Sequence, residues 1–234
     1  MGKTETDKKQ AAGGDGMSHI AGTPTDGVLT AGKAAGHLRT VLHHKRLVAE
    51  GCFQVGLYWQ GLTHDLSKFS PTEFLNGVRF YQNGVQSPNN GERVKKGYSE
   101  AWMHHKGRNR HHYEYLTDYS IEAVRAGRDP VQPVRMPRRY VAEMLMDRIA
   151  ASKTYMKDRY TDEAPLNYYS SGKAKQLLHE RTAAELRKQL STVVTTKLTD
   201  RLSFRIHVFQ SIRHFLFKKR IVFFLYTFRY IGAP

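Results

Sequence analysis

Apolar and histidine side chains recur at helical intervals from residue 37 onwards, a spacing that places them on one face of a helix. The positions are His37, Val41, His44, Val48, Val55, Trp59 and Leu62. Because Gly51 and Gly56 interrupt this period, the pattern predicts two helices or one bent helix. The dipeptide His64–Asp65 then falls at a helix end.

The next helix has a strong start signal in "SPTEF". Ser70 is the expected N-cap, Pro71 stands at the first helical position, and Glu73 completes a capping box. The following "NGVQSPNNG" is rich in turn residues and predicts a polar loop. A shorter helix is expected from about residue 98 to 105, with a break at 107–109 and a restart at "HHYEYL".

Two later segments complete the predicted secondary structure. "MPRRYVAEMLMDRIAASKTY" places Pro137 before a long apolar stripe and is the clearest helix of the chain. "TAAELRKQLSTVVTTKL" opens with Thr182 and Glu185, which form a second capping box. Since no segment before residue 203 alternates as strands do, the pattern predicts an all-α helical bundle.

Composition divides the chain into three parts. Residues 1–36 are rich in Gly, Ala and Thr and predict a disordered tail, whereas residues 37–202 form the expected helical domain. Residues 203–234 form a basic, aromatic-rich C-terminal extension with six Lys or Arg and no acid. This extension is expected either to pack partly on the body or to bind a membrane surface or partner. Its longest uncharged run, 221–228, is far below the ~18–20 residues that span a bilayer, so no transmembrane segment is expected.

The charge and cysteine content narrow the classes of function. The formal net charge is +16, and much of the excess lies in residues 37–202, which favours phosphate-bearing partners, including nucleic acid. Cys52 is the only cysteine, which excludes a disulfide framework and a cysteine-based zinc cluster. With a polar N-terminus that lacks a signal sequence, this predicts an intracellular, cytoplasmic protein.

Histidines are concentrated in the first half of the predicted domain. Eight of the twelve lie between residues 37 and 112, namely His37, His43, His44, His64, His104, His105, His111 and His112. His44 lies on one predicted helix, His64 and Asp65 lie at the end of the next, and Asp147 lies at the edge of the apolar stripe of a third. These four residues are candidate ligands of one metal ion. Two imidazoles and two carboxylates suit a divalent ion such as Mn, Zn, Fe, Co or Mg.

The order H…HD…D on consecutive helices, with HD followed by x-x-K, is similar to that of the HD-domain metal-dependent phosphohydrolases. A closer resemblance, over about residues 37–190, is to the uncharacterised domain-of-unknown-function family 5662. It rests on the blocks "HDLSKFSPTEF", "GYSEAWMHHKGRNRHHYEY" and "MPRRYVAEMLMDRIAAS". The closer resemblance implies no activity, whereas the HD likeness implies an all-α, HD-like fold and phosphoester hydrolysis.

The HD likeness assigns roles to particular residues. It implies that His44, His64, Asp65 and Asp147 hold the metal, that Asp65 also orients the attacking water, and that Lys68 contacts the substrate phosphate. A second metal or the phosphate is expected at His104, His105, His111 and His112. Further phosphate contacts are expected from Lys106, Arg108 and Arg110. The expected substrate is a nucleotide or another small phosphoester.

Simpler interpretations exist for the same residues. A helix-terminal His-Asp pair often serves as a cap, Lys68 and "KGRNR" can be solvated surface, and Asp147 can pair with Lys153. Two other functions also fit the composition. One is a non-catalytic basic protein that binds nucleic acid through "HHKGRNRHHYEY". The other is a nuclease with a His-Asn-His arrangement within "HHKGRNRHH".

Overall fold

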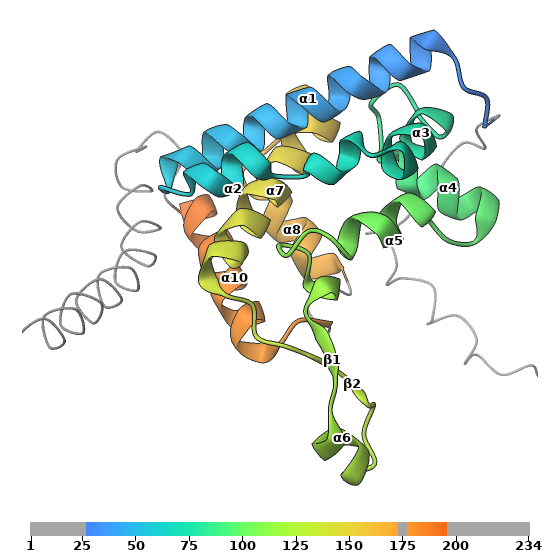
Figure 1. The fold of residues 1–234 in the computed structure, drawn as a ribbon. Coiled ribbons are helices and arrows are strands. Elements are labelled where there is room, and N and C mark those ends of the chain that lie inside the picture. The colour runs from blue at the N-terminus through green and yellow to red at the C-terminus, as the bar shows by residue number, and fades with distance from the viewer. Residues whose placement is uncertain (1–26, 173–176, 196–234) are drawn as a thin grey trace, which may run out of the picture.

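The computed structural model describes residues 27–172 and 177–195, and helices predominate in them (Figure 1). The elements in chain order are α1 (Ala31–Gln54), α2 (Tyr58–Thr63), the 3-10 helix η2 (Leu66–Phe69), α3 (Pro71–Arg79), α4 (Pro88–Lys96), α5 (Glu100–Lys106), η3 (Tyr113–Tyr115), β1 (Thr117–Tyr119), α6 (Ile121–Arg125), β2 (Val131–Pro133), α7 (Arg138–Met156), η4 (Lys157–Arg159), α8 (Ala164–Ser171) and α10 (Glu180–Thr195). The predicted all-α class is confirmed. The predicted tail, up to residue 26, and the predicted C-terminal extension 203–234 lie outside the described residues.

The two long helices α1 and α7 pack against each other and carry much of the core (Figure 1). One stripe of α1 is buried throughout its length and consists of His37, Val41, His44, Val48 and Cys52. A Cβ atom on Gly51 would lie 2.8 Å from Met146 Sδ, so the glycine permits the close approach of α7. This contact brings His44 on α1 opposite Asp147 on α7.

α1 begins earlier than its sequence pattern predicts. Thr30 caps it by accepting a hydrogen bond from the Lys33 backbone N–H (3.2 Å), so the predicted boundary at residue 37 falls inside the helix. The helix continues through Gly51, and the chain turns at Gly56 with a positive φ of 75°. The stretch is therefore two helices, and His64 follows α2 directly, as predicted.

The predicted polar loop "NGVQSPNNG" is wrong in its second half, where α4 begins. Ser87 is the N-cap residue and Pro88 the first helical residue, while Gly97 ends the helix in the left-handed region at φ 82°. The periodic signal is weak because α4 exposes most of its length, including Val94. The predicted helical restart at "HHYEYL" is only the single 3-10 turn η3.

A short hairpin departs from the all-helical prediction. β1 and β2 pair antiparallel, with Thr117 opposite Pro133 and Tyr119 opposite Val131, and α6 lies between them. The hairpin extends away from the helical body (Figure 1). Strands of three residues are too short to show alternation, so the sequence pattern did not reveal them.

The capping box predicted from Thr182 and Glu185 is wrong. α10 already begins at Glu180, so Thr182 lies within the helix and not at its N-cap. The buried Thr182 hydroxyl accepts a hydrogen bond from the Met136 backbone N–H (3.0 Å), and Glu185 pairs with Arg138 (3.3 Å). Both side chains therefore attach α10 to the start of α7. No helix of the described part is long and apolar enough to cross a membrane.

A buried carboxylate joins α4 to α5. The Glu92 side chain accepts hydrogen bonds from Ser99 Oγ (2.7 Å), the Ala101 backbone N–H (3.3 Å) and the Lys96 ammonium (3.0 Å). Burial alone would raise the pKa of Glu92, but the Ser99 and Lys96 donors outweigh it and lower that pKa. Glu92 is thus ionised at neutral pH and fixes the first turn of α5.

We predict that Glu92→Gln destabilises the fold by about 1–3 kcal/mol, because buried donors lose a charged acceptor. Since the folded-state pKa is lowered, the stabilisation is present above the unfolded-state value of about 4.3 and is lost as pH falls through the folded-state pKa. Urea unfolding at pH 7 and pH 4 measures both effects. The control Glu100→Gln removes an exposed charge near Lys96 and should cost no more than about 0.5 kcal/mol. Equal losses for the two variants would contradict the buried role of Glu92.

Candidate metal centre

Four side chains from three segments converge between α1 and α7, and we call them the first cluster. Its members are His44, His64, Asp65 and Asp147. Asp147 Oδ1 lies 3.1 Å from His44 Nε2 and 3.7 Å from His64 Nε2. Asp65 Oδ2 lies 3.3 Å from His64 Nε2 and 3.9 Å from His44 Nε2. The four residues selected from the sequence are therefore neighbours in the structure.

The turn after α2 places the His-Asp pair. Asp65 adopts left-handed backbone angles (φ 54°, ψ 29°), which aspartate tolerates better than most residues. The half-buried Lys45 ammonium donates hydrogen bonds to the carbonyl oxygens of Leu62 (2.8 Å) and His64 (2.7 Å). Two neighbouring residues of α1 therefore contribute to the site. His44 is a member of the first cluster, and Lys45 stabilises the turn that carries Asp65.

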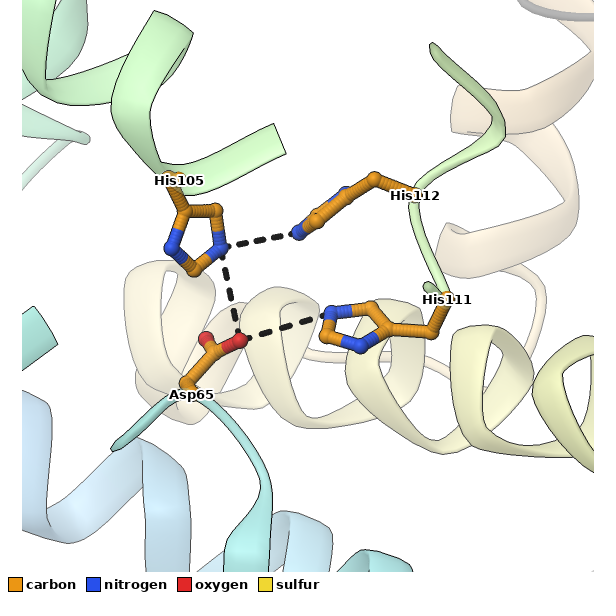
Figure 2. Close-up of side chains that lie close together, drawn as sticks. All are labelled: Asp65, His105, His111 and His112. Atoms are coloured by element: carbon orange, nitrogen blue, oxygen red, sulfur yellow. Dashed lines mark hydrogen bonds and ion pairs between the residues drawn. The ribbon is translucent and has the colours of Figure 1, made fainter. Parts of the chain in front are cut away.

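A second cluster lies on the other side of the same carboxylate and consists of Asp65, His105, His111 and His112. Asp65 Oδ1 lies 3.3 Å from His105 Nε2 and 3.4 Å from His111 Nε2. The Nε2 atoms of His105 and His112 are 2.9 Å apart. Figure 2 shows the three imidazoles, from α5 and the loop after it, arranged around one space with Asp65. Asp65 therefore belongs to both clusters, one oxygen to each.

Two outer carboxylates orient the imidazoles. Glu143 Oε1, on α7, lies 3.0 Å from His64 Nδ1 and 3.2 Å from His111 Nδ1. Glu73 Oε2 lies 2.8 Å from His105 Nδ1. Because carboxylates accept hydrogen bonds, each of these three imidazoles donates its Nδ1–H outward, so in its neutral form its Nε2 lone pair faces the cluster. This is the usual arrangement around ligating histidines.

Sequence reasoning missed both of these roles. Glu143 stands four residues before Asp147 on α7, and this spacing places both carboxylates on one face of the helix. The spacing therefore indicates that Glu143 lies near the candidate ligand Asp147. The predicted capping-box role of Glu73 is wrong for its side chain. Ser70 does cap α3 by accepting from the Glu73 backbone N–H (3.4 Å), but the Glu73 carboxylate pairs with His104 and His105 instead.

Four inner atoms of the clusters are buried and lack hydrogen bonds within the described part of the chain. In the described part of the chain, His44 Nε2, His64 Nε2, His111 Nε2 and Asp65 Oδ1 have no hydrogen-bond partner of acceptable geometry. Acceptor atoms this close repel one another unless a cation lies between them. Ligands about 2.1 Å from one ion lie about 3.0–3.4 Å apart, a range that includes the His44–Asp147 (3.1 Å) and His64–Asp65 (3.3 Å) separations of the first cluster and both Asp65–imidazole separations of the second (3.3 and 3.4 Å). The residues therefore fit a divalent metal ion.

Opposite charges at the centre shift the pKa values of Asp65 and His64 in the directions that favour their ionised forms. Burial would raise the pKa of Asp65, but His105, His64 and Lys68 outweigh it and hold that pKa well below its ordinary value. Burial would lower the pKa of His64, but Asp65, Asp147 and Glu143 raise it well above normal. The carboxylates at the centre are thus anionic and attract a proton or a metal ion.

A comparison with protein families matches residues 33–192 to the model of a family of unknown function, DUF5662. The chain belongs to the DUF5662 family. No curated protein and no solved structure matches the chain. The likeness to HD-domain phosphohydrolases therefore has no support from these comparisons and rests on the residues and their geometry.

The structure separates the other candidate residues of this DUF5662 protein. Lys68 lies at the centre, with its ammonium 3.1 Å from Asp65 Oδ2. His104 is in neither cluster, and its Nδ1 pairs with Glu73 Oε1 (2.7 Å). Arg108 donates to the His104 carbonyl oxygen (3.2 Å), and the Arg110 guanidinium lies over the Tyr115 ring, 5.7 Å from its centroid.

The same loop has two further features. Lys106 is half-buried in the last turn of α5. Asn109 donates to Ser67 Oγ (2.8 Å) and to the His105 carbonyl oxygen (2.8 Å), so it fixes the loop between His105 and His111. Since His104 is in neither cluster, three of the four candidate histidines belong to the second cluster, namely His105, His111 and His112.

We predict that Lys45→Met lowers stability by about 1–3 kcal/mol and metal affinity by about 10–100-fold, because the turn that carries Asp65 loses its two hydrogen bonds. Denaturant unfolding and metal titration measure the two effects. Arg46→Met is the matched control, since it removes a neighbouring charge of α1 that pairs with the exposed Glu50. Unchanged metal affinity in Lys45→Met would show that the turn holds its shape without Lys45.

Proposed function

We propose that this DUF5662 protein is a metal-dependent phosphohydrolase that acts on a nucleotide or another small phosphoester. The observation that supports it best is the first cluster. Two imidazoles and two carboxylates, in the order His44, His64–Asp65 and Asp147, converge on one point beside the cation Lys68. The same order of residues underlies the likeness to the HD-domain phosphohydrolases.

A divalent ion held at this point would supply a water of lowered pKa and a Lewis acid for a phosphoryl oxygen. The chain would supply the rest. Asp65 lies between His64 and Lys68 and is placed to orient the attacking water by accepting its hydrogen bond. The Lys68 ammonium, partly exposed, would offset charge on the phosphate as it reacts. Glu143 and Glu73 would keep the imidazoles in the ligating tautomer.

The geometry gives less support to the two alternative functions. Within "HHKGRNRHH", Asn109 donates to Ser67 Oγ and the His105 carbonyl oxygen and so fixes the loop, while His105 and His111 belong to the second cluster. A non-catalytic nucleic-acid-binding protein has no need of buried imidazoles with unpaired nitrogen atoms. The basic residues Arg108 and Arg110 remain compatible with phosphate binding near the loop.

We predict that the purified protein contains a stoichiometric divalent metal and that Asp147→Asn removes much of it. Asparagine keeps the size and hydrogen-bonding capacity of the side chain but removes the anionic ligand. Elemental analysis measures the metal, and a panel of nucleotides and p-nitrophenyl phosphate measures hydrolysis. Asp158→Asn, in the exposed turn η4, is the matched control and should retain both. Wild-type metal content in both Asp65→Ala and Asp147→Asn would contradict the proposal.

We predict a different result for Lys68→Ala, which should keep the metal and lower kcat/KM for phosphoesters by about a hundredfold. The lysine would contact substrate and not the ion, so only the stabilisation of phosphate charge is lost. Lys188→Ala, on the exposed face of α10, is the control for charge removal and should leave kcat/KM unchanged. Loss of metal in Lys68→Ala would instead indicate that the ammonium supports the fold of the Asp65 turn.

A further inference from the structure

The two clusters share Asp65 but offer different ligand atoms. The first has two imidazole nitrogens and two carboxylates, whereas the second has three imidazole nitrogens and the single carboxylate of Asp65. Carboxylates suit hard ions such as Mg²⁺ and Mn²⁺, and imidazole suits Zn²⁺ and similar transition ions. The difference in ligand atoms therefore predicts a difference in metal preference between two adjacent positions.

His112 is responsible for the difference. Its Nε2 atom faces the same space as those of His105 and His111, although it lies beside His111 in the chain (Figure 2). The Trp102 ring packs against His112 with a centroid separation of 4.8 Å and an edge-on geometry, which holds the imidazole from the side. The Arg93 guanidinium lies over Trp102, 5.7 Å from the ring centroid. The orientation of His112 is thus maintained by packing.

The close approach of His105 and His112 has two interpretations. His105 donates its Nδ1–H to Glu73, so its Nε2 carries a lone pair. In the first interpretation His112 Nε2–H donates to that lone pair across the 2.9 Å separation and blocks it. In the second, both lone pairs point to one ion. The unpartnered, buried His111 Nε2 and Asp65 Oδ1 favour the second, because a His105–His112 hydrogen bond would leave both without a partner.

We propose that the second cluster is a zinc-selective site with His112 as its third imidazole ligand, and that the first cluster accepts a harder ion such as Mn²⁺. This inference rests on the proposed metal centre but not on the reaction. The protein would then hold two different ions, with Asp65 Oδ1 directed to one and Oδ2 to the other.

The test uses the full chain, stripped of metal by a chelator and titrated with Zn²⁺ in the presence of Mn²⁺. Wild-type protein should bind one Zn²⁺ and one Mn²⁺ per chain. His112→Ala should weaken Zn²⁺ binding at least about tenfold and leave Mn²⁺ bound, whereas Asp147→Asn should have the opposite effect. Co²⁺ in place of Zn²⁺ should give a visible absorption spectrum that changes in His112→Ala but not in Asp147→Asn.

Two controls distinguish a lost ligand from a damaged fold. His43→Ala removes an exposed histidine beside His44 and should behave as wild type. His112→Gln keeps more of the side-chain volume, and circular dichroism checks that each variant is helical. If either folded His112 variant has wild-type Zn²⁺ affinity and the wild-type Co²⁺ spectrum, His112 is not a ligand and the inference is wrong.

Other outcomes separate this inference from the proposed function. If the wild-type protein binds two ions of the same kind without preference, the selectivity is wrong even where hydrolysis is observed. If it binds Zn²⁺ and Mn²⁺ as expected but hydrolyses no phosphoester, the proposed function fails and the two-metal site stands. If it binds no metal, both proposals fail.

Discussion

The buried carboxylate of Asp65 is the constraint around which the rest of the structure is arranged. Its side chain is only 3 % exposed, and a carboxylate removed from water costs several kcal/mol unless cations or donors compensate it. The Lys68 ammonium, 3.1 Å from Asp65 Oδ2, compensates part of this negative charge. The imidazoles that face Asp65 come from α1, the end of α2, α5 and the loop after α5, so the compensation also depends on how the helices pack.

The carboxylates of the centre form two layers. Asp65 and Asp147 lie inside, facing Nε2 atoms, and Glu73 and Glu143 lie outside, facing Nδ1 atoms. Glu143 contacts one histidine of each cluster, His64 and His111, and so links the two clusters as Asp65 does. An ion at either position would therefore influence the histidines of the other. A centre of this kind couples metal binding to folding, since its ligands come together only in the folded chain.

The second cluster depends on α5, and α5 is held at three places. Glu92 accepts hydrogen bonds from its first turn, Trp102 packs against His105 and His112 from its middle, and Glu73 orients His105 near its end. α4 supplies Glu92 and α3 supplies Glu73. Helices that contribute no ligand thus set the positions of the ligands, and this explains why buried acids occur at the contacts between α3, α4 and α5.

Local sequence sufficed for the elements with strong periodicity or caps, whereas the first cluster followed from the order of its residues along the chain, which resembles that of the HD-domain phosphohydrolases. α7 and the Ser70–Pro71 start of α3 followed from spacing and capping chemistry, and His44, His64, Asp65 and Asp147 followed from helix positions and the HD motif. α4 and the hairpin did not, because an exposed helix and three-residue strands have little periodic signal. The partners of Glu73 and Glu143, and the separation of His104 from the other three histidines, depend on contacts between residues 31 to 79 positions apart. No local pattern encodes such contacts, because packing of helices from distant parts of the chain determines which side chains meet.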